Sequence, residues 1–172
     1  MDINAACRFL DEQIQDKTTG LPDGIFYFIS RVTPLVNTDL LIKNGKGQIL
    51  LAWRDDQYCG KGWHIPGSIV RFKEKLEHRI IETAKKELGT TDIIYDIAPL
   101  TIQEIIIPEL ENRAHFISFL YRCSLKDDFA IINDGKSAND PGYLAWHDTC
   151  PSNLIAMQEP YRKFIDDKRD DD

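Results

Sequence analysis

The stretch from Trp63 to Gly89 constrains the fold of this chain more than any other part of it. Its residue order predicts a short strand, a turn at Pro66-Gly67, a second short strand, and a helix that begins near Glu74 and ends at Gly89. On a helical wheel the helix presents one apolar arc, formed by Leu76, Ile80, Ala84 and Leu88, with Ile81 at its edge. The pattern predicts a helix that packs by one face on a core.

Glu87 falls inside this apolar arc, between Leu76 and Ile80 in angle. A carboxylate aimed at a core is costly unless it is paired or binds a cation. Two explanations are open. Glu87 forms an ion pair with an Arg or Lys from elsewhere in the chain, or it binds Mg²⁺ together with backbone carbonyls of the Pro66-Gly67 turn, since carboxylate and carbonyl oxygens are ligands that Mg²⁺ prefers.

The unit resembles the Nudix box, in which a Gly is followed by five residues, a Glu, seven residues and then Arg-Glu-apolar-x-Glu-Glu-x-Gly. Glu74, Glu87 and Gly89 match this pattern. The departures are Ser68 at the first Gly, Glu82-Thr83 at the Arg-Glu pair and Lys86 at the first of the paired glutamates. The resemblance implies an α/β fold, the Nudix α/β/α sandwich with a mixed sheet. The lost acids disfavour a pyrophosphohydrolase with three or four metal-binding glutamates.

Further segments resemble one branch of the Nudix superfamily, the GDP-mannose mannosyl hydrolases, which tolerate a depleted box. These segments lie at matching spacing and comprise residues 33–40, 50–54, 63–67, 74–77 and 115–118. The resemblance covers roughly residues 25–165. It implies Mg²⁺ as the cofactor, a nucleotide sugar as the substrate, and a metal site formed by the Gly67 carbonyl and the Glu87 carboxylate. The alternative for Gly67 is that it only permits a positive φ in the turn.

The same resemblance implies that Arg54 contacts the substrate phosphates and that Asp39 contacts the sugar. A guanidinium suits a diphosphate because it donates two parallel hydrogen bonds, although Arg54 also has Asp55 and Asp56 as neighbours for a surface ion pair. Asp39 lies in the middle of an apolar strand, where a structural hydrogen bond is the rival explanation. The branch has an arginine where this chain has Ile69, and we expect Arg71, two residues on, to substitute for it.

The family's third metal ligand comes from a Gln-His pair before the last strand, and this chain has no His there. The corresponding positions lie near residues 139–141. Asp140 is therefore a candidate metal ligand or catalytic base, and the alternative is a turn at Asp140-Pro141-Gly142.

The rest of the chain predicts helices at residues 3–16 and 23–32, and strands at 35–43 and 48–53 joined by a hairpin at 44–47. Later strands are predicted at 94–107, with an interruption near 98–99, at 115–124 and at 143–147, before a final helix at 152–164. Three parts follow: a helical extension at 1–32, a Nudix domain at 33–168 and an acidic tail at 169–172. The run Ile25 to Ile29 is more apolar than one helix face needs, so we expect the extension to form a homodimer, and the alternative is that this surface packs on the core of the same chain.

Composition excludes several kinds of partner. The formal charge is −7 with no cluster of Lys and Arg, which argues against nucleic acid. No apolar run is long enough for a membrane span, and the acidic residues near the N-terminus do not suit a signal peptide. The four cysteines form no CxxC pair and fit reduced thiols, so we expect a cytoplasmic protein.

The sequence therefore predicts Mg²⁺-dependent hydrolysis of a nucleoside-diphosphate sugar. Loss of acids at Thr83 and Lys86 favours attack at the sugar carbon, where one metal on the departing diphosphate suffices, over attack at phosphorus. The alternatives are a pyrophosphohydrolase that cleaves the P–O–P bridge and a non-catalytic nucleotide-sugar sensor.

Overall fold

The strands form two sheets, with β1 (Leu35–Ile42) and β2 (Ile49–Asp56) each in an interior position. The computed structural model describes residues 2–167. In the first sheet the order is β4-β1-β7-β5, and β6 also pairs with β7; in the second the order is β3-β2-β8. The pairing of β1 with β7 is parallel and the other pairings within the sheets are antiparallel, so the first sheet is mixed.

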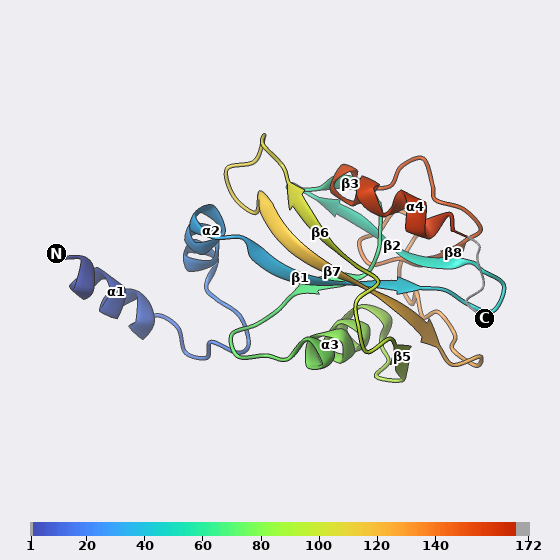
Figure 1. Cartoon of the computed structure of the whole chain (residues 1–172), viewed down its shortest axis with the longest axis horizontal. Helices are drawn as coiled ribbons and strands as arrows, with labels where there is room; N and C mark the ends of the chain where they lie inside the picture. Colours follow the sequence, from blue (N-terminus) through green and yellow to red (C-terminus); the bar gives the residue numbers. More distant parts are fainter. Residues whose placement is uncertain (1, 168–172) are drawn as a thin grey trace.

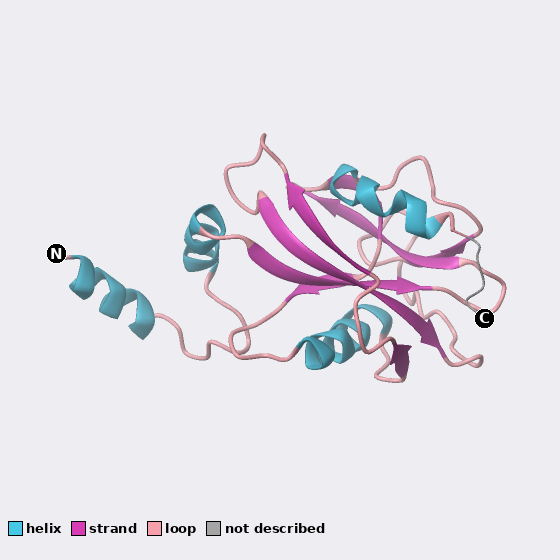
Figure 2. Ribbon diagram, viewed as in Figure 1, coloured by secondary structure: helices cyan, strands magenta, loops and turns pink. Residues whose placement is uncertain are grey.

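The remaining elements follow in chain order around these two strands (Figures 1 and 2). They are α1 (Ile3–Glu12), α2 (Asp23–Val32), β3 (Gly60–His64), β4 (Gly67–Ile69), α3 (Leu76–Leu88), β5 (Ile93–Tyr95), β6 (Thr101–Ile106), β7 (His115–Leu125), β8 (Leu144–His147), the 3₁₀ helix η1 (Ala156–Tyr161) and α4 (Arg162–Ile165).

β1 and β2 are interior because both of their faces are apolar. Successive strand residues point to opposite faces. Leu41 and Leu51 belong to the apolar cluster that includes residues of η1 and α4, whereas Leu40 and Leu50 belong to the cluster that includes residues of α3. Helices therefore cover both sides, as Figure 1 shows for α3 and α4. The predicted α/β/α sandwich with a mixed sheet is confirmed.

Several predicted boundaries are wrong in instructive ways. The hairpin at 44–47 forms only as a turn with a single bridge, Lys43 to Ile49, because β1 and β2 then enter different sheets. Pro66-Gly67 likewise carries the chain from the second sheet to the first. Gly67 is not among the residues with positive φ, so its role is not to permit a left-handed turn.

The two terminal helical predictions are too long. The predicted helix at 3–16 ends at Glu12, and the final helix divides into η1 and the short α4. Pro160 lies inside η1 and supplies no backbone N–H, which favours the break. The predicted end of α3 is confirmed, since Gly89 caps it in the left-handed conformation at φ 75°.

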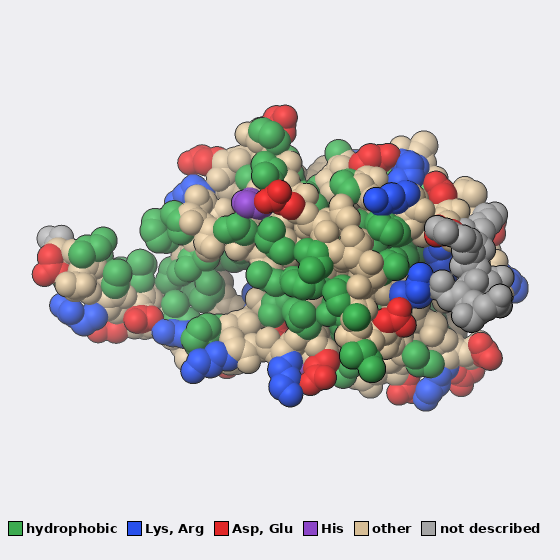
Figure 3. Space-filling model, viewed as in Figure 1, with side chains coloured by type: hydrophobic (Ala, Val, Ile, Leu, Met, Phe, Trp, Pro, Cys, Tyr) green, Lys and Arg blue, Asp and Glu red, His purple; other side chains and the backbone are tan. Residues whose placement is uncertain are grey.

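The N-terminal extension divides into two differently packed helices. Figure 1 shows α1 projecting away from the sheets, whereas α2 lies beside them. In α2, Ile25 is buried and Phe26 packs against the core, so much of the apolar run is used within the chain. Phe28 and Val32 stay exposed, as do Ile102 and Ile106 of β6, where Figure 3 shows apolar side chains gathered on the surface. Dimer formation through residues 1–32 stays a prediction.

Two further expectations concern a membrane span and the acidic tail. Among the helices of residues 2–167, none has the length and apolar character needed to cross a membrane. The predicted acidic tail at 169–172 lies outside the described residues.

Glu74 organises the start of α3 without being part of it. Its side chain is only 7% exposed and accepts hydrogen bonds from the Arg71 backbone N–H at 2.8 Å and from Arg79 Nε and Nη2 at 2.7 Å each. His78 lies 2.7 Å from the same carboxylate. Although burial acts in the opposite sense, these partners hold the pKa of Glu74 down at about 2. Glu74, which matches the isolated Glu of the Nudix box pattern, therefore has a structural role in this chain.

We expect Glu74→Gln to lower the free energy of unfolding at pH 7 by about 2 kcal/mol, because charged hydrogen bonds to Arg79 are lost. The pKa of Glu74 is depressed on folding, so the wild type should lose this contribution as the pH falls from near 4.5 toward 2, and the variant should lack that part of its pH dependence. Urea titrations at several pH values measure both. Glu82→Gln, in an exposed pair with Lys85, is the matched control and should change stability little.

Candidate functional site

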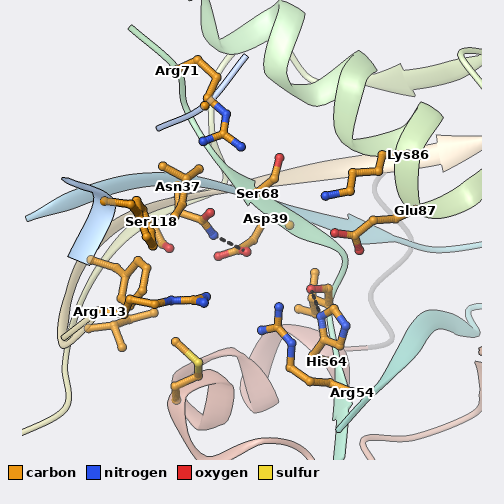
Figure 4. Close-up of a pocket in the computed structure, with 18 of the residues that line it drawn as sticks. Asn37, Asp39, Arg54, His64, Ser68, Arg71, Lys86, Glu87, Arg113 and Ser118 are labelled. Carbon is orange, nitrogen blue, oxygen red and sulfur yellow. Dashed lines mark hydrogen bonds between the residues drawn. The ribbon is translucent and has the colours of Figure 1, made fainter. Parts of the chain in front are cut away.

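A cavity of about 430 Å³ lies between the two sheets and is lined by residues of α2, α3 and η1 as well. Five of the six predicted site residues line it: Asp39, Arg54, Gly67, Arg71 and Glu87. Figure 4 shows the side chains of Asp39, Arg54, Arg71 and Glu87 around the cavity, each from a different element or loop. A second cavity of about 260 Å³ shares Arg54, His64, Lys86 and Glu87 with the first. The fold thus brings together residues that are up to 48 positions apart in sequence (Asp39 to Glu87).

Gly67 lies where β4 pairs with β1, directly opposite Asp39. A Cβ atom at Gly67 would stand 2.1 Å from Asp39 Oδ1 and 2.9 Å from the Thr38 carbonyl oxygen, closer than real side chains allow. Only glycine leaves room for the Asp39 carboxylate at this point. Glycine is required at position 67 because β1 and β4 approach each other closely there.

The register also frees the polar backbone groups of Gly67. Leu40 donates to the Pro66 carbonyl and Val70 donates to the Val36 carbonyl, so the hydrogen-bonded pairs lie on either side of Gly67. Because such pairs alternate in an antiparallel ladder, the Gly67 N–H and C=O point away from β1. β4 is an edge strand, and these groups therefore face the site.

Glu87 lies at this free edge, near the end of α3. Burial raises its pKa to about 7, and the neighbouring Asp39 charge acts in the same sense, whereas Arg54, Lys86 and the Gly67 backbone act to lower it. Among the ion pairs of the described residues none includes Glu87. The first explanation, an ion pair between Glu87 and an Arg or Lys, therefore does not hold for the described residues.

The Glu87 carboxylate and the Gly67 carbonyl fit a hard cation such as Mg²⁺. Both are oxygen donors at a partly buried site, and a cation there would remove the cost of two neighbouring acids. The set is sparse. Within residues 2–167 no three His, Cys, Asp or Glu side chains are grouped to hold a metal ion. These donors suit one ion that keeps water or substrate oxygens as its other ligands.

The two box positions that lost their acids have different environments. Thr83 is buried, and its hydroxyl is hydrogen-bonded to Ser68 and donates to the Arg79 carbonyl. Ser68 and Thr83 thus fill the space between β4 and α3 with a pair of hydroxyls. Lys86 is exposed and lines both cavities, which puts a positive charge where the box pattern has a carboxylate.

Asp39 makes the structural hydrogen bonds that were its rival explanation and also lies in the cavity, while its contact with a sugar stays a prediction. It is buried, lines the cavity, and accepts hydrogen bonds from Tyr161 Oη at 2.6 Å and from Asn37 Nδ2 at 2.7 Å. Burial raises its pKa to about 6, although the hydrogen bonds from Tyr161, Ser118 and Asn37 and the charge of Arg54 act to lower it. A structural hydrogen bond and a place in the site are therefore compatible.

The predicted arginines reach the cavity by different routes. Arg54 forms the ion pair with Asp56, Nε to Oδ2 at 3.0 Å, and still lines both cavities. Arg71 lies beyond the end of β4 with its guanidinium against Gly20, where a Cβ would be 3.5 Å from Nη1. The N-terminal segment thus forms part of the cavity wall.

His64 is a further cavity residue, at the end of β3. Its ring is buried, and Nδ1 lies 2.9 Å from the Ile65 carbonyl oxygen, so Nδ1 carries the proton and Nε2 is left as an acceptor. Burial lowers the pKa of His64 to about 4, and the positive charge of Arg54 acts in the same direction. The imidazole is therefore neutral at physiological pH.

The structure does not bring Asp140 to the cavity. Asp140 is exposed, lines neither cavity, and its carboxylate accepts a hydrogen bond from the Ser137 backbone N–H at 2.7 Å. Its backbone N–H donates to Ser137 and its carbonyl accepts from Tyr143. The turn explanation therefore accounts for this residue, while the adjoining Pro141 and Gly142 line the smaller cavity.

Sequence reasoning missed two residues that shape the site. Tyr161 comes from η1, and the buried Asp39 was the signal that some donor must lie opposite it. Arg113, in the loop between β6 and β7, lines the larger cavity, and no motif marks it.

Comparisons with known proteins bear on the fold. No model of a known protein family matches the chain. The low-salt glycan biosynthesis protein Agl8 of Haloferax volcanii is 27% identical over 120 residues, which are 67% of this chain and 75% of that protein.

Solved structures are more informative. A MutT protein from Methanosarcina mazei superposes with a TM-score of 0.59 at 18% identity, over 78% of this chain and 94% of that one. A MutT Nudix hydrolase from Burkholderia pseudomallei gives 0.58 at 20% identity, over 77% and 95%. The chain has the Nudix fold. These similarities establish the architecture of the chain. The substrate has to be inferred from the chemistry of the site.

We expect Gly67→Ala to displace the Asp39 carboxylate and to part β1 and β4 locally, because the added methyl group meets Asp39 Oδ1 and the Thr38 carbonyl oxygen. The stabilisation of the folded protein by millimolar Mg²⁺, measured as a shift in melting temperature, should shrink or vanish in the variant. Gly45→Ala is the control, since a Cβ there has no neighbour within 4 Å. An unchanged Mg²⁺ response in Gly67→Ala would contradict the assigned site.

Proposed function

We propose that this protein hydrolyses a nucleoside-diphosphate sugar of the GDP-mannose type with Mg²⁺, at the bond between the sugar carbon and the diphosphate oxygen. The observation that carries the proposal is the composition of the cavity edge. One carboxylate, Glu87, remains beside the free Gly67 carbonyl, and the other two acidic box positions hold Thr83 and the cationic Lys86. The Nudix fold, shared with hydrolases in the comparison, supports a hydrolytic reaction.

Glu87 and the Gly67 carbonyl would hold the Mg²⁺. When bound, the ion supplies positive charge that offsets the negative charge on the departing diphosphate. The chain's own cations contribute in the same sense, since Arg54, Arg71 and Lys86 line the same cavity. Fixed cations in a partly buried site stabilise developing negative charge without having to reorganise.

Attack at the sugar carbon fits this charge distribution better than attack at phosphorus. Enzymes that attack phosphorus commonly hold two or more metal ions, for which this cavity offers too few acids. Cleavage at the sugar instead develops positive charge on the sugar ring, away from the diphosphate. The role of the cations here is to stabilise the leaving group.

Asp39 replaces Asp140 as the proposed acceptor of a proton from water. It lines the cavity, whereas Asp140 lies outside it, and its pKa of about 6 is near the range in which a general base works best. Asn37 donates a hydrogen bond to Oδ1 of this carboxylate and Tyr161 donates one to Oδ2, and together they fix its orientation.

The decisive experiment is hydrolysis in ¹⁸O-water of a panel of nucleoside-diphosphate sugars that includes GDP-mannose. Water that attacks the sugar carbon leaves its label in the free sugar, and this is the outcome we expect. Label in a phosphate would instead establish a pyrophosphohydrolase. Glu87→Gln should lower turnover by at least about 100-fold as a metal-ligand control. Binding of a nucleotide sugar without any turnover would favour the sensor.

We expect Asp39→Asn to lower kcat by about 10²- to 10⁴-fold, because the amide cannot accept the proton. Asp140→Asn should change kcat by less than about tenfold, since exposed turn residues contribute little to distant chemistry. Steady-state kinetics and melting temperatures of both variants separate a catalytic effect from loss of folding. Equal loss of activity in the two variants would restore Asp140 as the base.

A further inference from the structure

Arg113 is held in place by contacts that include no ion pair within residues 2–167. Its backbone adopts φ 55°, a conformation uncommon outside glycine, and its N–H donates to Ser30 Oγ at 3.1 Å. The guanidinium carbon lies 4.6 Å from the ring centre of Tyr58 and 5.8 Å from that of Phe26. Two aromatic rings and an anchored loop thus fix the position of one cation.

The polar atoms of this guanidinium are only partly satisfied. Nε is buried without a hydrogen-bond partner, and no ion pair of the described residues includes Arg113. Two acids are in its neighbourhood. Asp56 is already bound by Arg54 and by the backbone N–H groups of residues 58 and 59, and Asp23 lines the same cavity from α2. Neither lies within 4.0 Å of the guanidinium as a salt-bridge partner.

The position of Arg113 in the cavity indicates what it meets. Figure 4 shows Arg113 reaching into the cavity from the side opposite Glu87 and Lys86. Under the proposed function the diphosphate lies at the Glu87 end, so the guanidinium faces the remote end of the ligand. Its terminal N–H groups form a planar fork, which suits a group with two anionic oxygens.

We propose that Arg113 is an anion receptor that selects nucleotide ligands with a third anionic group, remote from the metal-binding end. Two sources share this chemistry: a carboxylate on the sugar, as in a uronic acid, and a third phosphate. The proposal rests on the proposed function for the orientation of the diphosphate. It adds a specificity that Arg54 and Lys86 do not explain, since both line two cavities together with Glu87 at the diphosphate end, while Arg71 lies against Gly20.

The test compares UDP-glucose, UDP-glucuronate and UTP, and the matching guanosine compounds, in calorimetric titrations of the full-length protein with Mg²⁺. The wild type should bind at least one compound with a third anionic group about 10- to 100-fold more tightly than the neutral sugar nucleotide, the range expected for a charge-assisted hydrogen-bonded pair. Preference for the glucuronate identifies a carboxylate ligand, and preference for the triphosphate identifies a phosphate.

Arg113→Gln should abolish that preference while changing the affinity for the neutral sugar nucleotide by less than about threefold. Arg113→Lys, which keeps the charge but lacks the fork, should retain part of it. Arg122→Gln is the matched control, because Arg122 lies on β7 beside Asp96 and lines neither cavity. Melting temperatures check that each variant folds.

The outcomes separate this proposal from the proposed function. Selective, Arg113-dependent binding without turnover would support the receptor and overturn the hydrolase. Hydrolysis of the neutral sugar nucleotide with no Arg113-dependent preference would overturn the receptor and leave the hydrolase. A preference that survives in Arg113→Gln also overturns the receptor, and failure of every ligand to bind overturns both.

Discussion

The cross-strand pair of Asp39 and Gly67 is the contact on which the site depends. The carboxylate of Asp39 occupies the space that any side chain at position 67 would need. The same register turns the Gly67 backbone groups outward toward Glu87. A buried acid and a free backbone carbonyl are therefore placed in one cavity by a single pairing of two strands, and Tyr161 secures the acid from the opposite side.

The charge in the cavity depends on two residues of α3, Thr83 and Lys86, which stand where the Nudix box pattern has acids. A helix with a full set of acids would create strongly negative potential and require several cations. Here Thr83 is bound to Ser68 in the packing between strand and helix, and Lys86 brings a cation to the rim. Glu87 and Asp39 consequently have raised pKa values through burial rather than through a crowd of like charges. This charge distribution is the basis for proposing a reaction with an anionic leaving group rather than one that needs several metal ions.

Five of the six predicted site residues line one cavity, because they belong to or adjoin regular elements with readable periodicity. Glu87 stood out as an acid on an apolar helix face, and Asp39 as an acid within an apolar strand. Asp140 was misplaced because a sequence count locates a loop residue along the chain but not in space, and its carboxylate closes a local turn. Arg113 left no signal, since its importance arises from aromatic rings contributed by two other segments.

The sequence by itself determined the layered α/β architecture and the end of α3, and it singled out Glu87 as an acid on an apolar helix face. These depend on local patterns: apolar periodicity, the left-handed Gly89 cap and the spacing of the box. Only the tertiary structure decided that β1 and β2 enter different sheets, that Gly67 is required for close approach rather than for a turn, and that Glu74 binds Arg79. The physical reason is that these features depend on contacts between segments that are distant in sequence. Packing of the whole core determines which of those contacts form.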